Sequence, residues 1–123
     1  MIEFQHKGVN NMSIAGDLIR GHTDAVILAR LLKGDSYGYE INKEISTLSD
    51  RRFELKEATL YTAFKRLEEQ GLITSYWGDS GAGARRRYYA ITPAGQLASR
   101  QLVEEWKETK EIMDKLLEAE EEK

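Results

Sequence analysis

Apolar side chains recur at helical spacing through the first half of the chain. Over Asp17–Lys33 their recurrence predicts one well-buried helix, which Gly34 ends just past its last turn. A second helix is predicted over residues 37–49, with Asp35 and Ser36 as side-chain caps. Its apolar stripe consists of Tyr37, Ile41, Ile45 and Leu48. The pattern therefore predicts two helices joined by a short turn.

A third amphipathic helix is predicted over Lys56–Gln70, with Gly71 supplying the stop. Its buried stripe has the spacing i, i+3, i+4, i+7 and consists of Leu60, Ala63, Phe64 and Leu67. At 100° per residue the opposite face is polar, and it carries Ala58, Thr62, Lys65, Arg66 and Glu69, flanked by Thr59 and Tyr61. Three consecutive helices with short connections are typical of a helix-turn-helix, in which the third helix is the candidate reader of DNA.

A β-hairpin is predicted directly after this helix. Residues 72–77 are rich in aromatic and β-branched side chains, residues 78–84 contain three glycines, and residues 85–92 return as a second strand. A hairpin in this position indicates the winged variant of the helix-turn-helix.

A long helix then begins at Thr92-Pro93, where threonine caps the helix and proline fits its first turn. It is predicted to run to about Leu117, well beyond the mean of ~11–12 residues for globular helices. Its stripe through Leu102, Trp106, Met113 and Leu117 is spaced by 4, 7 and 4 residues, as suits a partner helix. The expected fold class is mainly α with a small β-hairpin: a winged helix-turn-helix plus one long C-terminal dimerisation helix.

These elements divide the chain into four segments. Residues 1–16 lack a sustained apolar period and are expected to form a flexible N-terminal tail, in which Met12 is an alternative start of translation. Residues 17–92 form the expected DNA-binding domain, and residues 93–117 the dimerisation helix. Residues 118–123 form an acidic tail.

The distribution of charge singles out the middle of the chain. The net charge is −3, yet residues 51–92 carry eight Lys or Arg against five acids. Residues 1–50 carry five against seven, and residues 93–123 carry five against nine. A DNA-binding face needs local positive potential and not a basic whole protein, so the charge pattern agrees with the position of the predicted reader and hairpin.

Several classes of site are not predicted. The sequence contains no cysteine, and neither His6 nor His22 has acids at metal-ligand spacing. It contains no Gly-rich phosphate loop, nucleophile elbow or paired catalytic carboxylates, so we expect neither an enzyme nor a cofactor. No apolar run approaches the ~20 residues of a membrane span. We therefore expect a cytoplasmic protein without a membrane partner.

The polar face of the third helix supplies the candidate DNA contacts, since short polar side chains, Lys and Arg bind base edges or phosphates. Its N-terminal end should face the bases, whereas Lys65, Arg66 and the Tyr61 phenol suit phosphates. Glu57 would either accept from a cytosine amino group or repel the backbone. The predicted contacts on this helix are Lys56, Glu57, Ala58, Thr59, Tyr61, Thr62, Lys65 and Arg66. The alternative is an ordinary solvated helix face.

The run Arg85, Arg86 and Arg87 opens the second strand of the hairpin. Side chains alternate faces along a strand, so these three cannot all point the same way. We expect one or two to reach phosphate or the minor groove and the third to pair with acids within the fold. The alternative is a charged edge that discourages sheet aggregation.

Trp106 lies in the middle of the long helix among charged residues. As a large aromatic it suits an anchor of the dimer interface. The alternative is that two copies, related by a two-fold axis, form the walls of a flat ligand pocket. Periodicity by itself favours the anchor.

From Leu18 to Leu117 the sequence resembles the PadR family of regulators, including its compact, multidrug-binding branch. The matching stretches are Gly38-Tyr39-Glu40-Ile41, Ala58-Thr59-Leu60-Tyr61, Lys65-Arg66-Leu67-Glu68, Gly71-Leu72-Ile73, Arg87-Tyr88-Tyr89 and Thr92-Pro93-Ala94-Gly95. The resemblance implies a homodimer in which the C-terminal helix packs on the other subunit's N-terminal helix. It also implies repression that a planar aromatic ligand relieves. Trp106 would stack on this ligand, and Asp24, Ala25 and Lys110 would line the same cavity.

The expected partner is therefore double-stranded DNA, bound by the dimer at a pseudo-palindromic operator with half-sites about 34 Å apart. Ligand entry at the dimer interface would change the separation of the two reading helices. Two alternatives remain: a ligand-binding dimer with little DNA binding, and a winged helix used for protein contacts.

Overall fold

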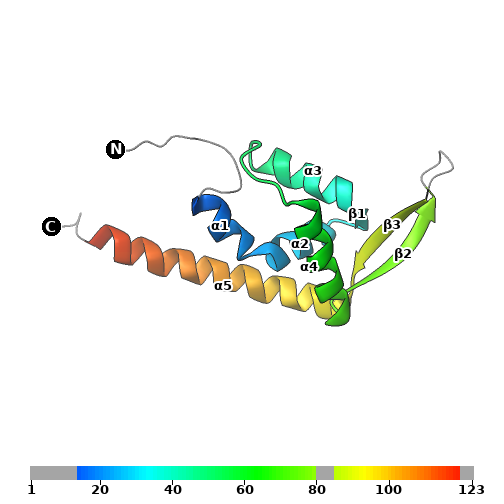
Figure 1. The fold of residues 1–123 in the computed structure, drawn as a ribbon. Helices are drawn as coiled ribbons and strands as arrows, with labels where there is room; N and C mark the ends of the chain where they lie inside the picture. The colour runs from blue at the N-terminus through cyan, green and yellow to red at the C-terminus, as the bar shows by residue number, and fades with distance from the viewer. Residues whose placement is uncertain (1–13, 80–84, 120–123) are drawn as a thin grey trace.

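The computed structural model describes residues 14–79 and 85–119. Its elements are, in chain order, α1 (Ile14–Arg20), α2 (Thr23–Leu31), β1 (Ser36–Tyr37), α3 (Gly38–Leu48), α4 (Glu57–Glu69), β2 (Ile73–Asp79), β3 (Arg85–Ile91) and α5 (Pro93–Glu118). Figure 1 shows the β2–β3 wing projecting on one side of the helical body, while α5 runs away on the other. The predicted fold class, a mainly helical winged helix with a long C-terminal helix, is confirmed.

The core lies between α2, α3, α4 and one face of the sheet. On α4 the buried side chains are the four that the spacing predicted, Leu60, Ala63, Phe64 and Leu67. The Phe64 ring stacks on Tyr89 of β3, with the ring centroids 3.9 Å apart. The other buried apolar side chains are Ile27, Leu28, Leu31, Ile41, Ile45, Phe53, Leu55 and Ile73. Because this core fixes the rotation of α4, it also fixes which side chains α4 presents to solvent.

The single helix predicted over residues 17–33 is wrong. The structure has two helices, α1 and α2, separated at Gly21 and His22. The amide of His22 donates to Ile19 O (2.8 Å), which ends α1 with a tighter turn. The Thr23 hydroxyl donates to Arg20 O (2.7 Å) and satisfies another carbonyl at this end. Since α1 begins at Ile14, residues 14–16 belong to a helix; the rest of the expected tail, with Met12, lies outside the described residues.

The predicted side-chain cap of α3 by Asp35 and Ser36 is also wrong. Tyr37 occupies the cap position in an extended conformation, with no side-chain cap hydrogen bond. Ser36 and Tyr37 instead form strand β1, which pairs with β3 in a three-stranded antiparallel sheet of order β1-β3-β2. The Ser36 hydroxyl donates to Glu40 Oε1 (2.6 Å). A strand of two residues is too short to show the alternation that predicts one.

Leu48 was predicted to lie on the buried stripe of α3, but its side chain is 64% exposed. Ile41 and Ile45 are buried, as predicted. α3 ends at Leu48, and the chain beyond it is held by Asn42. The Asn42 Nδ2 donates to Leu55 O (2.7 Å) and its Oδ1 accepts from Leu55 N (2.9 Å). This pair of hydrogen bonds brings Leu55 into the core in place of Leu48.

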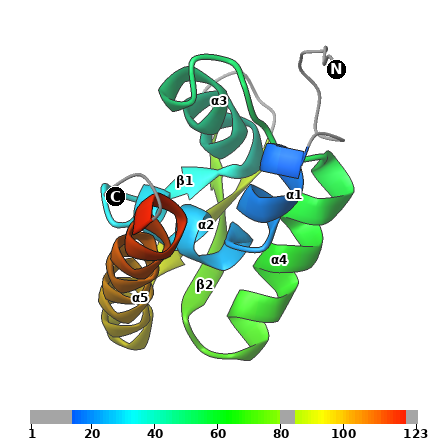
Figure 2. The same cartoon turned by 90° about the vertical axis from the view of Figure 1, so that its left-hand side faces the viewer.

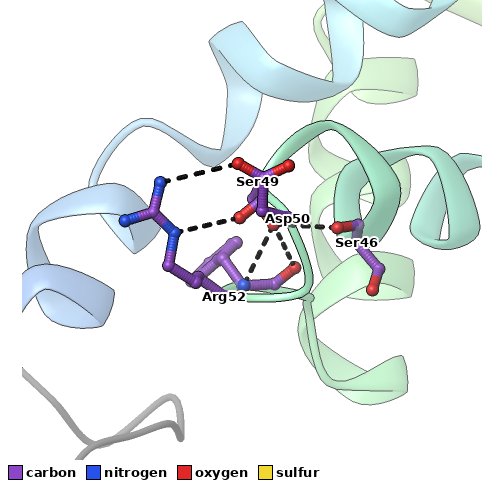
Figure 3. Close-up of polar contacts among 5 residues, drawn as sticks. Ser46, Ser49, Asp50 and Arg52 are labelled. Atoms are coloured by element: carbon purple, nitrogen blue, oxygen red, sulfur yellow. Dashed lines mark hydrogen bonds and ion pairs between the residues drawn. The ribbon is translucent and has the colours of Figure 1, made fainter.

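The connection from α3 to α4 is a turn organised by Ser49 (Figure 3). Its Oγ accepts a hydrogen bond from Phe53 N (3.0 Å), and its carbonyl accepts one from Arg52 Nε (3.2 Å). Asp50 and Arg51 both have positive φ, 57° and 63°. Residues other than glycine adopt positive φ at a cost in free energy. The hydrogen bonds of Ser49 therefore hold the turn in this conformation and fix the path of the chain toward α4.

The start of α5 follows the prediction. Thr92 Oγ1 accepts a hydrogen bond from Gly95 N (3.0 Å) and donates one to Gly71 O (2.7 Å). Gly95 packs directly on the backbone, since a Cβ there would lie 2.1 Å from Leu72 O. The absence of a side chain at Gly95 therefore lets α5 approach the end of α4 and the start of β2.

Gly95→Ala is expected to lower the free energy of unfolding by about 1–3 kcal/mol or more, because the added methyl must displace backbone. Gly21→Ala is the matched control, since a Cβ there meets only Leu18 O at 3.4 Å. Chemical denaturation of both variants measures the effect. Equal stability of the two would contradict this account of the α5 junction.

Candidate nucleic-acid interface and adjoining cleft

The polar face of α4 is open to solvent. Its exposed side chains are Ala58, Tyr61, Thr62, Lys65, Arg66 and Glu69, and Thr59 is half-buried. Lys56 occupies the cap position in an extended conformation, without a side-chain cap, and Lys56 and Glu57 are both exposed. Among the described residues, Lys65 has no ion-pair partner. The predicted reading face thus lies together on one helix, with Lys65 available to an external anion.

The three arginines of the wing have different partners. Arg87 lies 3.6 Å from Glu68 Oε1 and donates to Ser75 Oγ (3.0 Å), so it is the one that pairs within the fold. Arg85 lies over the Trp77 ring, 5.3 Å from its centroid, and Arg86 over the Tyr37 ring at 4.4 Å. Cation–π contacts of this kind position a guanidinium without neutralising its charge. Arg85 and Arg86 therefore keep positive charge on the wing.

A groove of about 500 Å³ lies between the wing and the N-terminal end of α3. It is lined by Tyr37, Gly38, Tyr39, Tyr61, Trp77, Arg85, Arg86, Arg87 and Tyr89. Tyr39 is 71% exposed and Trp77 55% exposed, and sequence reasoning assigned a site role to neither. The hydrophobic pattern already accounts for both residues, since Tyr39 lies in a predicted helix and Trp77 in a predicted strand. Only the fold shows that they share a groove with Tyr61 and Arg85.

A second aromatic group adjoins this groove through Tyr37. The Tyr76 and Tyr88 rings stack with centroids 5.7 Å apart, and Tyr37 meets Tyr88 edge-on at 5.4 Å. The Tyr76 hydroxyl donates to Asp35 Oδ2 (2.6 Å), and this hydrogen bond raises the pKa of Tyr76 above its usual value. These contacts join the wing to β1 and to the segment before it, and so orient the hairpin relative to α4.

A cleft of about 280 Å³ lies where α2 faces α4 and α5, and Figure 2 shows α2 between these two helices. It is lined by Gly21, His22, Thr23, Asp24, Ala25, Arg66, Leu102, Glu105, Trp106 and Thr109. The Trp106 side chain is 47% exposed and meets the His22 ring edge-on, with centroids 5.2 Å apart. The cleft thus brings Asp24 and Ala25 together with Trp106. Lys110 is exposed on α5 and does not line the cleft.

Arg66 and Asp24 form an ion pair at the rim of this cleft. The Arg66 Nη2 contacts Asp24 Oδ1, and Nε donates to Asp24 Oδ2 (3.4 Å), so both ends of the carboxylate are engaged. The hydrogen bond that Arg66 donates to Asp24 raises the pKa of Arg66 above its usual value. In this structure the guanidinium expected to bind phosphate is therefore bound to α2.

Exposed apolar side chains are spread along the length of α5. They are Leu97, Val103, Trp106, Ile112, Met113, Leu116 and Leu117. On α1, Leu18 and Ile19 are exposed as well. At 100° per residue Trp106, Met113 and Leu117 lie on one side of α5, and an exposed apolar stripe of this kind often marks an interface.

The described part of the chain holds no group of three or more His, Asp or Glu side chains that could bind a metal ion. No helix in residues 14–79 and 85–119 is both long and apolar enough to cross a membrane.

Comparison with known proteins agrees with this geometry. Residues 27–101 match the family described as the transcriptional regulator PadR-like family. An uncharacterised protein of Lysinibacillus sphaericus is 48% identical over 105 residues, which cover 85% of this chain and 96% of that protein. A transcriptional regulator from Clostridium thermocellum is 48% identical with a TM-score of 0.76, covering 84% of this chain and 97% of that one. A PadR family transcription regulator from Clostridium difficile R20291 is 39% identical with a TM-score of 0.70, covering 79% and 99%. The chain belongs to the PadR-like family of transcriptional regulators.

Proposed function

We propose that the chain regulates transcription by binding double-stranded DNA, with α4 in the major groove and the wing on the neighbouring backbone. The observation that carries this proposal is the polar face of α4, which presents Lys65 to solvent, together with the charged Arg85 and Arg86 on the wing that follows this helix. A helix of about 10–12 Å diameter fits the major groove, where short polar side chains distinguish base pairs.

The two parts of the interface have different tasks in this proposal. Lys56, Glu57, Ala58 and Thr59 lie at the N-terminal end of α4, which reads bases in helix-turn-helix proteins. The groove that contains Tyr39, Tyr61 and Arg85 can accept the phosphate backbone, since it offers phenol hydroxyls and a guanidinium. Base contacts would supply specificity, and backbone contacts would fix the register.

Footprinting on duplex DNA from upstream of the chain's own gene tests this function. We expect two protected half-sites with centres about 10–10.5 base pairs apart or a multiple of that spacing, since each protomer of a dimer presents one α4. An unrelated duplex of equal length is the control. Equal, unlocalised protection of both duplexes would contradict a sequence-reading role.

We further propose a homodimer that buries exposed apolar side chains of α5. Leu116→Lys with Leu117→Lys is expected to convert the dimer to a monomer, because it places charges where apolar surface would be buried. Leu48→Lys is the control, since Leu48 is similarly exposed, at 64%, but lies on α3. Sedimentation equilibrium measures the mass. A dimer in both variants would exclude this part of α5 as the interface.

The proposed regulator is a repressor whose effector is a planar aromatic molecule, as its resemblance to the multidrug-binding regulator LmrR suggests. The half-exposed Trp106 at the cleft supports this, because its ring offers a stacking surface. Trp77→Phe leaves Trp106 as the only tryptophan. We expect a planar dye such as ethidium to quench its fluorescence saturably. The single variant Trp106→Ala, which keeps Trp77 as a reporter, should show no such saturable quenching. An unchanged signal across a panel of planar dyes would reduce Trp106 to an interface anchor.

A further inference from the structure

The Arg66 guanidinium lies between two sites. It belongs to α4, one helical turn after the exposed Thr62, and its side chain is 43% exposed. It is also the only Lys or Arg among the residues that line the cleft of Trp106. The reading helix and the cleft therefore share this side chain.

Asp24 competes with an external anion for the Nε–Nη2 side of the Arg66 guanidinium. A guanidinium binds a carboxylate or a phosphate through the same fork of N–H donors, and Asp24 occupies two of them, on Nη2 and Nε. Asp24 lies on α2, which packs against α4 and is fixed by core side chains such as Ile27 and Leu28. The carboxylate cannot follow Arg66 toward a DNA backbone, so Arg66 must leave Asp24 to bind a phosphate through the same pair of donors, Nε and Nη2.

We infer that Asp24 restrains DNA binding by holding Arg66 in the cleft, so that this ion pair lowers the affinity of α4 for DNA. The inference rests on the proposed DNA-binding function and assigns a means of regulating it. A molecule that enters the cleft beside Trp106 meets this ion pair, so cleft occupancy and DNA affinity act on the same contact. The coupling is reciprocal: DNA that takes Arg66 leaves the Asp24 carboxylate open in the cleft.

Asp24→Asn tests this effect of the Asp24–Arg66 ion pair on DNA affinity, and the test needs no cleft ligand. We expect the full chain to bind an operator duplex roughly two- to fivefold more tightly, since a partly exposed ion pair is worth little. We also expect the plot of log affinity against log salt to steepen by about one charge per protomer, because Arg66 then adds a phosphate contact. Fluorescence anisotropy with a labelled duplex measures both quantities.

Two further variants separate the pair from the loss of a negative charge. In an Arg66→Ala background, Asp24→Asn should leave the affinity unchanged, because the released side chain is absent. Glu105→Gln removes a carboxylate from the same cleft, and Glu105 has no ion-pair partner among the described residues, so it should give less than half of the Asp24→Asn gain.

An unchanged affinity of Asp24→Asn would overturn the inference. A weaker affinity would also overturn it and would assign Asp24 to positioning α4 for DNA. An equal gain from Glu105→Gln would overturn it as well, since general electrostatics would then account for both. A wild-type chain that binds no duplex at all would overturn the proposed function and the inference together. Thermal unfolding of each variant shows that these comparisons are made between folded proteins.

Discussion

Replacing Lys65 and Arg85 together by alanine is expected to lower the affinity for duplex DNA by about a hundredfold or more. Each side chain is exposed and carries a charge that no ion pair neutralises among the described residues. A hydrogen bond to a charged group contributes about 1.5–3 kcal/mol, and the dimer loses each contact twice. Lys65 represents α4 and Arg85 the wing, so the double variant tests both halves of the interface. Electrophoretic mobility shift at fixed salt measures the loss.

The matched control is Lys107→Ala with Lys115→Ala. It removes the same number of charges from α5, where Lys107 pairs with Glu104 and Lys115 with Glu111. We expect its DNA affinity to stay within about threefold of the wild type, since exposed pairs contribute little and α5 is not part of the reading face. Equal losses in the two double variants would show that overall charge, and not the α4–wing surface, determines binding.

Phe64→Ala is expected to lower the free energy of unfolding by about 3–5 kcal/mol. Phe64 is 1% exposed, stacks on Tyr89 and meets Tyr61 edge-on, so its loss leaves a cavity between α4 and the sheet. Small domains are stable by about 5–15 kcal/mol in total, and much of that margin would be lost. Denaturant titration followed by circular dichroism measures the change.

Leu48→Ala is the control for the predicted effect of Phe64→Ala on the free energy of unfolding. Leu48 is apolar but exposed, so its truncation should change the stability by about 0.5 kcal/mol or less. A Phe64→Ala effect below about 1 kcal/mol would show that α4 is not held by the buried contacts of Phe64. The position of the reading face would then need another explanation.

Most of the helical fold could be predicted because apolar residues recur along the chain at helical spacing. The spacing of Leu60, Ala63, Phe64 and Leu67 defines both the buried and the exposed face of α4. The features that were missed are those with no period. A two-residue strand, Ser36–Tyr37, exists because β3 offers it a pairing edge, and the break at Gly21 depends on hydrogen bonds that only the folded turn makes.

The candidate site could be predicted residue by residue but not contact by contact. The face of α4 was predicted with Lys65 and Arg66 as equivalent phosphate ligands. The structure distinguishes them, because Asp24, 42 residues earlier in the chain, lies against Arg66 and not against Lys65. In the same way, Tyr39 and Trp77 become candidates only because the wing and the start of α3 line the same groove in the folded chain. Such pairings depend on tertiary packing, which no local pattern encodes.

The central claim, that this chain binds DNA through a cationic reading helix and wing, is tested most directly by the salt dependence of its affinity for an upstream operator duplex. For a dimer that makes about six to ten phosphate contacts, the affinity should fall by about 10³–10⁵-fold between about 50 and 200 mM salt, with a linear log–log plot. The wild-type chain is predicted to show this fall while remaining specific for the operator over an unrelated duplex. An affinity that is independent of salt, or no binding at about 50 mM salt, would contradict the claim.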